Sequence, residues 1–148
     1  MDANDWNARY AAAADDLVWA AEPNLFVADE LATSPLAPGT ALDLGCGEGR
    51  HAVWLAAHGW QVRAVDFAEA GIDKGRALAE RTGVDVDWVV ADVVGYDAGE
   101  RFDLVLIAYL HLPWSAMSDV LARGVGALAE GGTLLAVGHH VDNIDHGV

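Results

Sequence analysis

Three glycines at alternating positions, Gly45, Gly47 and Gly49, end the apolar run in "ALDLGCGEGR" (residues 41–50). Glycine has no side chain, so it adopts positive φ angles and lets backbone amides approach a ligand closely. A helix is expected to begin just after this loop, and its N-terminus favours a polar ligand. The spacing indicates a ligand-binding loop. A tight strand-to-helix turn without a ligand is the alternative interpretation.

Asp66 closes the apolar run "QVRAVD", 21 residues after Gly45. An acidic side chain about 20 residues beyond a glycine-rich loop is placed to accept hydrogen bonds from both ribose hydroxyls of a nucleoside. By itself, Asp66 would also suit the N-cap of the helix that follows. The loop and the carboxylate together favour a nucleoside ligand.

Asp92, in "VVADVV" (residues 89–94), closes a further apolar run. Its carboxylate could accept from an exocyclic amine of adenine while the backbone of Val93 pairs with a ring nitrogen. Aspartate is also a common turn former, and that is the alternative interpretation of this residue.

These polar residues fall at the ends of strands that alternate with helices. After helices over about residues 5–20 and 24–33, the pattern predicts strands at 41–45, 61–66, 86–92, 103–110 and 133–138, separated by helices at 50–59, 69–83 and 115–132. In the last helix, Met117, Leu121, Val125 and Leu128 are expected on one face. Such alternation predicts an α/β fold with a parallel sheet that binds ligands at its carboxyl edge.

The charge balance restricts the partners that this chain can bind. The chain has 23 acidic and 8 basic residues in 148, a formal charge of -15. This charge disfavours nucleic acid and anionic membranes and favours a small molecule. No signal peptide or membrane span is recognised, so a cytoplasmic location is expected. Cys46, the single cysteine, cannot form an internal disulfide and is expected to pack rather than to act as a nucleophile.

The ordered motifs resemble those of class I S-adenosylmethionine-dependent methyltransferases, from about residue 40 to the end of the chain. They are "LDLGCGEGR", "VRAVDFAEAGI", "VVADV", "FDLVLIAYLHL" and "GGTLLAVG". The resemblance implies a three-layer α/β/α Rossmann-like fold with a mainly parallel sheet in order 3-2-1-4-5. It also implies an enzyme that uses S-adenosyl-L-methionine to methylate a small-molecule acceptor. We expect one domain, residues 1–148, with a helical lid at 1–38 and the cofactor-binding core at 39–148.

Two other functions fit parts of the pattern. A nicotinamide-dependent oxidoreductase would carry G-x-G-x-x-G, whereas this loop reads G-x-G-x-G. The resemblance gives Asp43 the task of holding the methionine amino group, a task that the nicotinamide interpretation does not provide. Capping of the loop amides by a buried Asp43 is the structural alternative. A non-catalytic module that binds the cofactor or its demethylated product is the second function considered.

The resemblance assigns cofactor-binding roles residue by residue. The methionine part of the cofactor would contact Asp43, Gly45, Gly47 and Gly49. The ribose would contact Asp66 and its neighbour Phe67, and the adenine would contact Asp92 and Val93. The first helix would cover the cofactor through Trp6 and Tyr10, one helical turn apart, although core packing would explain these two rings equally well.

The acceptor is expected after the fourth strand, in "AYLHLPW" (residues 108–114), where the resemblance places substrate contacts. Tyr109 and His111 are the catalytic candidates, because either could orient or deprotonate an acceptor. The alternative for His111 is packing under the cofactor without proton transfer. No metal is predicted. The tail carries metal-binding residue types, but their spacing matches no closed site, and the tail could instead line the acceptor pocket: His139, His140, Asp142, Asp145 and His146.

The chain departs from the family pattern after the fifth strand, where family members usually continue with a helix and two strands. The segment "TLLAVG" is then expected to form an open apolar sheet edge. We consider a shortened chain, a homodimer that covers this edge, and a cofactor-binding protein without an acceptor pocket.

Overall fold

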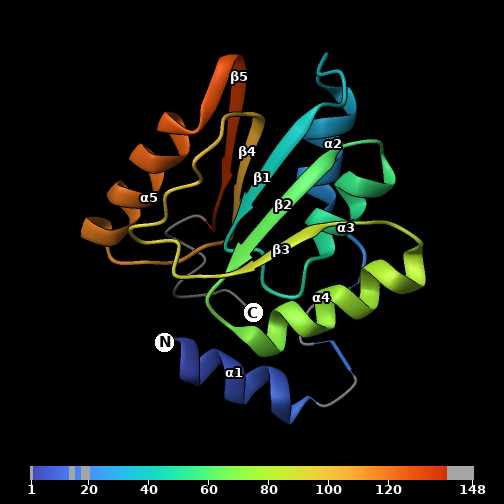
Figure 1. Cartoon of the computed structure of the whole chain (residues 1–148), viewed down its shortest axis with the longest axis vertical. Coiled ribbons are helices and arrows are strands. Elements are labelled where there is room, and N and C mark those ends of the chain that lie inside the picture. The colour runs from blue at the N-terminus through green and yellow to red at the C-terminus, as the bar shows by residue number, and fades with distance from the viewer. Residues whose placement is uncertain (1, 14–15, 18–20, 140–148) are drawn as a thin grey trace.

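The computed structural model describes residues 2–13, 16–17 and 21–139. Helices and strands alternate in these residues as the sequence predicts (Figure 1). Their order is α1 (Ala3–Ala12), α2 (Leu25–Thr33), β1 (Thr40–Leu44), α3 (Arg50–Ala57), β2 (Gln61–Asp66), α4 (Glu69–Thr82), β3 (Asp87–Val90), β4 (Phe102–Ala108), α5 (Trp114–Gly126) and β5 (Leu128–Val137).

Within the described residues, the strands form one five-stranded sheet in the order β3-β2-β1-β4-β5, and every pair is parallel. The predicted order and the Rossmann-like α/β architecture are therefore confirmed. Parallel strands need helical crossovers, which explains why every strand except the last leads into a helix or a long connection. The carboxyl ends of all strands meet at one edge.

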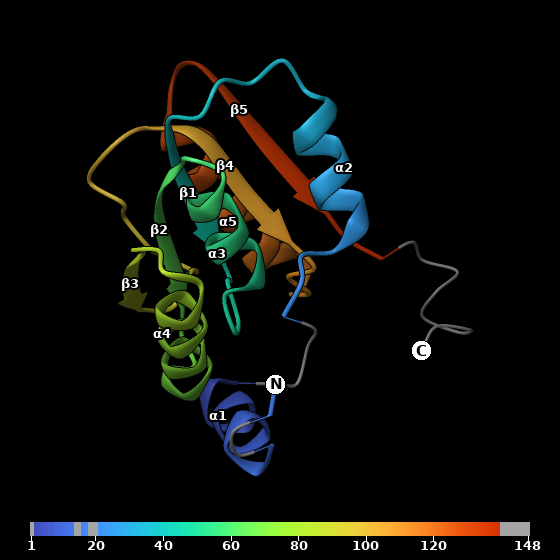
Figure 2. The ribbon, with the colours of Figure 1, turned by 90° about the vertical axis from the view of Figure 1, so that its right-hand side faces the viewer.

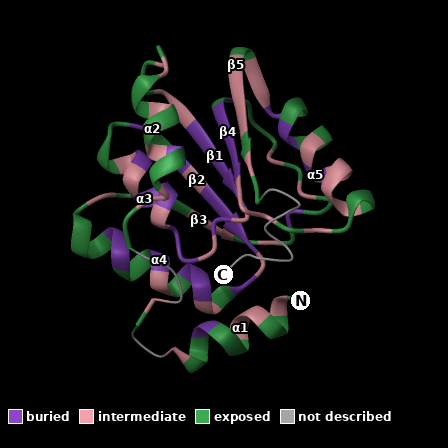
Figure 3. Cartoon of the chain, turned by 180° about the vertical axis from the view of Figure 1, so that it is seen from behind, coloured by how far each residue is buried: buried purple, intermediate pink, exposed green. Residues whose placement is uncertain are grey.

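Helices cover both faces of the sheet, and the two-residue repeat of the strands supplies each face with apolar side chains. On one face, Ala41 and Leu106 pack with α2, α3 and α4. On the other, Leu42 and Val105 pack with α5. Burial is concentrated in β1, β2 and β4, the middle of the sheet (Figure 3). Each fully buried aliphatic side chain contributes roughly 1.5–3 kcal/mol relative to an exposed one.

The two N-terminal helices have different surroundings. The side chain of Val27 in α2 is fully buried in the core, so α2 belongs to the layer that covers the sheet. Helix α1 lies outside that layer, against α4 (Figure 2). It starts at a capping box formed by Asp2 and Asp5 and ends at Ala12, short of the predicted residue 20. Only α1 therefore lies where a lid is expected.

The predicted extent of the last helix is wrong. Helix α5 ends at Gly126, and β5 begins at Leu128, which pairs with Phe102 of β4. The next pair along β4 joins Leu104 to Thr133, so the register between β4 and β5 shifts between these two pairs. Gly131, with a φ of 76°, lies in this irregular stretch of β5. Leu128 therefore packs from a strand instead of a helix, and Val125 is exposed. The bulge hides this strand from a search for regular alternation.

Two observations concern the surface. Among the described residues, β5 pairs only with β4, so it is an edge strand as expected. None of the helices in residues 2–13, 16–17 and 21–139 is long and apolar enough to cross a membrane.

Candidate functional site

The glycine loop leaves β1 at the carboxyl edge of the sheet. Gly45, Gly47 and Gly49 have φ angles of 79°, 57° and 82°. All three lie in the left-handed region that residues with side chains seldom adopt, so the predicted conformation is confirmed. The amides of Gly45 and Cys46 both donate to the Val65 carbonyl, at 2.8 and 3.0 Å, which ties the loop to β2.

The surroundings of the three glycines differ. A side chain at Gly49 would collide with the Trp88 ring, so protein packing alone requires a glycine there. A Cβ at Gly45 would lie 3.0 Å from Leu110 Cδ1, and one at Gly47 would lie 3.1 Å from the Tyr10 hydroxyl. These two glycines face the β4–α5 connection and α1, the two segments expected to enclose a ligand.

Helix α4 approaches the loop through a pair of glycines that the sequence analysis did not single out. A Cβ at Gly71 would lie 3.0 Å from the Gly47 carbonyl oxygen, and one at Gly75 would lie 3.2 Å from the Glu48 carbonyl oxygen. Both residues lie on one helical face because they are four positions apart. Glycines with this spacing inside a helix were the available signal, because glycine is unfavourable there without a packing reason.

Asp66 connects the loop to α4. Its Oδ2 accepts a hydrogen bond from the Gly47 amide and its Oδ1 accepts one from the Ala68 amide, both at 2.9 Å. The side chain is buried, which raises its pKa, while these backbone hydrogen bonds oppose the rise. Asp66 thus fixes the loop and the start of α4. Its role toward a ribose stays a prediction.

Asp43 lies in β1, two residues before the loop, and is 1% exposed. Its Oδ2 is buried and has no hydrogen-bond partner among the described residues. Burial raises the pKa of this carboxyl to about 7, the Asp66 carboxylate adds to the rise, and Arg50 opposes it. The Gly47 amide donates to Asp66 instead, so the interpretation of Asp43 as a cap for the loop amides is wrong.

Helix α1 closes over the loop and the N-terminus of α4. The Tyr10 ring is buried, stacks on Trp6 at a centroid distance of 5.5 Å, and lies close to Gly71. The Ala70 amide donates to Asn7 Oδ1 at 2.9 Å, which fixes α1 on α4. Tyr10 therefore lies against the loop, and Trp6 packs on Tyr10.

The residues predicted to contact adenine and ribose follow β3 and β2. Asp92 Oδ1 accepts from the Val94 amide at 2.9 Å, so this side chain does form the turn that was the alternative interpretation. Val93 is buried in the α5-side core, and Phe67 is half-buried beside Asp66. Contacts of these residues with a ligand stay predictions.

The two catalytic candidates lie at the end of β4. Tyr109 has a φ of 56°, an unusual value for a residue with a side chain, and its amide donates to the Val137 carbonyl at 2.7 Å. The His111 ring stacks on His139 at 5.1 Å, and the Tyr109 ring lies 4.9 Å from His139. Burial and the neighbouring His139 lower the pKa of His111, which favours the neutral imidazole that a base requires.

The predicted tail is described only as far as His139, and His140, Asp142, Asp145 and His146 lie outside the described residues. No group of three or more metal-binding side chains occurs in the part of the chain that the structure describes. Cys46 is buried, and burial with the nearby Asp43 and Asp66 raises the pKa of its thiol. The thiol is therefore a poor nucleophile.

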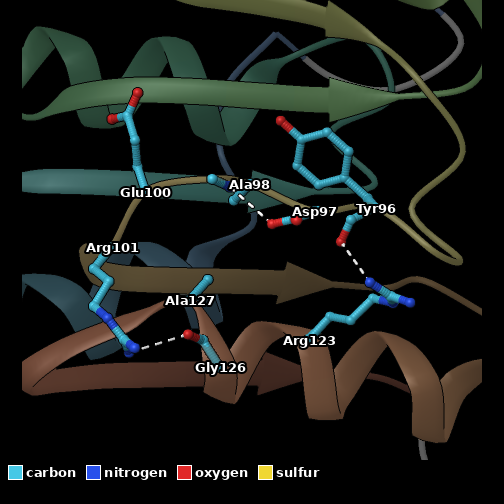
Figure 4. Close-up of a pocket in the computed structure, with 9 residues that line it drawn as sticks. Tyr96, Asp97, Ala98, Glu100, Arg101, Arg123, Gly126 and Ala127 are labelled. Carbon is cyan, nitrogen blue, oxygen red and sulfur yellow. Dashed lines mark hydrogen bonds between the residues drawn. The ribbon is translucent and has the colours of Figure 1, made fainter.

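Two cavities lie at opposite ends of the sheet. One, of about 580 Å³, lies beneath the β4–α5 connection and includes His111 in its wall. The other, of about 450 Å³, lies beside the β3–β4 connection and the end of α5 (Figure 4). In the second cavity, Arg123 donates to the Tyr96 carbonyl and Arg101 to the Gly126 carbonyl. Its residues come from the connection that leads into the start of β4 and from the end of α5, away from the carboxyl edge, so it takes no part in the site.

The chain was compared with known proteins. A family model described as "Methyltransferase domain" matches residues 41–132. The ubiquinone biosynthesis O-methyltransferase of Methylobacterium sp. (strain 4-46) is 36% identical over 111 residues, which are 73% of this chain and 44% of that protein. The ribosomal RNA small subunit methyltransferase C of Alcanivorax borkumensis is 43% identical over 47 residues, 32% of this chain and 14% of that protein.

Among solved structures, the N-methyltransferase NodS from Bradyrhizobium japonicum WM9, in complex with S-adenosyl-l-homocysteine, has the same fold. Its TM-score is 0.72 at 23% identity, and the match covers 88% of this chain and 71% of that one. The chain spans less than half the length of the two relatives matched by sequence.

Proposed function

The chain belongs to the S-adenosylmethionine-dependent methyltransferase family, and from this membership we propose that it binds S-adenosyl-L-methionine and transfers the methyl group to a small molecule. The cofactor would lie at the carboxyl ends of β1, β2 and β3. Its methionine part would lie at the glycine loop, its ribose at Asp66 and Phe67, and its adenine at Asp92 and Val93.

The observation that carries the proposal is the buried Oδ2 of Asp43, for which residues 2–13, 16–17 and 21–139 provide no hydrogen-bond partner. Buried polar atoms in folded proteins almost always have a hydrogen-bond partner, so this oxygen indicates an absent donor. An ammonium group would satisfy it and restore the charged carboxylate. The methionine part of the cofactor carries such a group next to a cationic sulfonium. The residues therefore fit the cofactor.

The charge of the site disfavours the nicotinamide alternative. Asp43 and Asp66 are both buried near the loop and interact electrostatically with each other. Two carboxylates at this position would repel a pyrophosphate, the part of a nicotinamide dinucleotide that glycine loops hold. A ligand with cationic groups at one end and ribose hydroxyls at the other suits them better.

Asp66 keeps the capacity to accept from a ribose. The two carboxylate oxygens have four lone pairs, and the backbone amides of Gly47, Ala68 and Phe67 hydrogen-bond to Asp66. One lone pair is left for a ribose hydroxyl. Binding would thus add to the existing hydrogen bonds without breaking them.

Methyl transfer from this cofactor requires little chemistry from the protein itself. When bound, the cofactor supplies a methyl group already activated by a sulfonium. The protein has to align an acceptor and exclude water. Tyr10 would cover the cofactor, and a neutral His111 would accept a proton from a protic acceptor, with Tyr109 orienting it. The formal charge of -15 favours a small molecule over RNA as that acceptor.

Calorimetric titration with S-adenosylhomocysteine, with NAD as the control ligand, tests the cofactor. We expect binding of the former alone, and weaker binding in Asp43→Asn. Binding of NAD alone would overturn the proposal. Transfer of radiolabelled methyl groups to candidate acceptors then separates an enzyme from the non-catalytic binding module, which would bind the product without turnover.

A further inference from the structure

Lys74 is the only lysine in the chain, and it lies in α4 between two other segments. Its side chain is 12% exposed, which is unusual burial for a lysine. The Nζ atom lies 3.5 Å from Oε2 of Glu48 in the glycine loop. It also donates a hydrogen bond to the carbonyl oxygen of Asp16, in the connection that follows α1. Lys74 therefore joins α4, the glycine loop and this connection.

The ion pair with Glu48 fixes where the ammonium group of Lys74 lies. The Glu48 side chain is 2% exposed, and burying a carboxylate is unfavourable unless an opposite charge or hydrogen bonds accompany it. An ammonium group has three N–H donors, so it can pair with Glu48 and still donate to the Asp16 carbonyl. The loop thus holds Lys74 in the position from which it binds the connection after α1.

Lys74 extends a row of contacts between α4 and the N-terminal part of the chain. Helix α1 lies against α4 (Figure 2), and its residues Asn7 and Tyr10 contact the first turn of α4. Lys74 lies one helical turn further along the same side of α4. Its partner Asp16 lies beyond the end of α1. Lys74 therefore holds the part of the chain that the contacts of α1 leave unattached to α4.

The part of the chain that Lys74 holds covers the proposed cofactor site. The Tyr10 hydroxyl lies 3.1 Å from the position that a Cβ would take at Gly47. A ligand at the loop would lie beside Tyr10, and its release would require α1 to leave the loop. A contact that keeps α1 docked would therefore keep such a ligand bound, and by linkage the bound ligand would keep α1 docked.

We propose that Lys74 is a positioning residue, which holds α1 and the connection after it over the glycine loop and thereby slows release of the cofactor. The part of this inference that concerns the cofactor rests on the proposed function. The attachment of α1 does not, so the two can fail separately.

Trypsin cleavage after Arg9 measures the docking of α1, because no other lysine or arginine precedes Arg50. Cleavage requires α1 to open, so its rate follows the population of the open form. In Lys74→Met, cleavage after Arg9 should be about tenfold faster, because a hydrogen bond from a charged group is lost. Arg76→Met removes an exposed ion pair with Asp73 on the same helix and should be cleaved like the wild type. Equal cleavage rates in the two variants would refute the attachment.

Dissociation of S-adenosylhomocysteine, followed by tryptophan fluorescence in a stopped-flow instrument, tests the link to the cofactor. It should be about tenfold faster from Lys74→Met than from the wild type or Arg76→Met, because the lost contact is the same one. Lys74→Arg keeps the charge in a larger, planar head group and should be intermediate. Faster cleavage after Arg9 with an unchanged dissociation rate would overturn the proposal, because α1 would then open without releasing the ligand.

The single lysine also allows a measurement that needs no substitution. Acetic anhydride acetylates amines, and peptide mass spectrometry gives the rate at Lys74 relative to the N-terminal amine. Saturating S-adenosylhomocysteine should slow acetylation of Lys74 about tenfold in the wild type, since the coupling is reciprocal. An unchanged rate would overturn the proposal.

An unchanged circular dichroism spectrum confirms that a variant is folded. If Lys74→Met does not fold, Lys74→Arg replaces it in the trypsin comparison and the acetylation rate decides the link to the cofactor. If S-adenosylhomocysteine does not bind the wild type, the cofactor proposal fails, and the trypsin comparison alone decides whether Lys74 holds α1.

Discussion

Asp43 has an environment that a stable fold would avoid. The carboxyl is buried, one of its oxygens has no hydrogen-bond partner in the part of the chain that the structure describes, and the charges of Asp66 and Arg50 act on its pKa. Isolated buried charges are unfavourable and usually lose their charge. We therefore predict that Asp43 serves cofactor binding and weakens the empty protein.

Asp43→Asn should therefore stabilise the empty protein and weaken cofactor binding. Above pH 7 the wild-type carboxyl is charged in the folded state, whereas asparagine is neutral, so the free energy of unfolding at pH 8 should rise by about 1–3 kcal/mol. Urea unfolding at pH 8 measures this, with Asp29→Asn on the exposed face of α2 as the control. A less stable Asp43→Asn protein would contradict the argument.

Asp66 differs from Asp43 in that both of its oxygens have hydrogen-bond partners. Asp66→Ala would leave the amides of Gly47 and Ala68 without acceptors and remove the proposed ribose contacts. We expect S-adenosylhomocysteine binding to weaken by about 1.5–3 kcal/mol and the loop to lose order. Calorimetry measures the affinity. Asp92→Ala, which breaks a single turn hydrogen bond and removes the proposed adenine contact, should have the smaller effect. Unchanged affinity in Asp66→Ala would exclude Asp66 from the ribose site.

At the scale of elements, the loop and α4 are fixed by glycine packing. In Gly75→Ala the new Cβ would lie 2.6 Å from the Trp88 ring and 3.2 Å from the Glu48 carbonyl oxygen. The overpacking should destabilise the protein by about 1–3 kcal/mol. Gly126→Ala in α5 meets no atom within 4 Å and should be neutral or slightly stabilising. Thermal unfolding of both variants checks this. Equal effects would mean that α4 can move away from the loop.

Some features of the helices and strands could be predicted from the sequence and others could not. The parallel sheet and the positive φ angles of the loop followed from the alternation of elements and from glycine spacing, which are local properties, whereas the strand order was implied by the family resemblance. The end of α5 followed from neither, because residues 128–132 look helical and become a strand only through pairing with Phe102.

The partners of individual site residues could not be predicted either. Asp43 and Asp66 have the same residue type and both lie in strands, yet the Gly47 amide donates only to Asp66. The approach of Tyr10 to the loop likewise depends on how α1 docks, through Asn7 and Gly71. These contacts join segments far apart in the chain, and no periodicity encodes them.

At the scale of the whole molecule, two buried titratable residues couple stability to pH in opposite directions. His51, in the first turn of α3, is buried, and its Nε2 accepts a hydrogen bond from the Asn24 amide at 3.1 Å, next to α2. Burial lowers the pKa of His51 to about 4, and Arg50 adds to the fall. Asp43 has its pKa raised to about 7.

The sign for each residue follows from which state takes up the proton. Between about pH 6.5 and pH 4 the unfolded state protonates His51 and the folded state does not, so its contribution to stability is lost as the pH falls. Between about pH 7 and pH 4 the folded state protonates Asp43 and the unfolded state does not, so stability is gained. Asp66, whose pKa is also raised, adds to the gain.

The wild-type protein should therefore change little in stability between pH 7 and pH 5, while the single variants should diverge. Asp43→Asn removes most of the gain that opposes the loss caused by His51. Its free energy of unfolding should therefore fall by about 1–2 kcal/mol between pH 7 and pH 5. His51→Gln keeps an acceptor for the Asn24 amide and should become more stable on acidification. Urea unfolding of the three proteins at both pH values measures the difference. Equal changes in the free energy of unfolding of all three proteins would mean that other groups control acid stability. The pKa values of Asp43 and His51 would then not be shifted as described above.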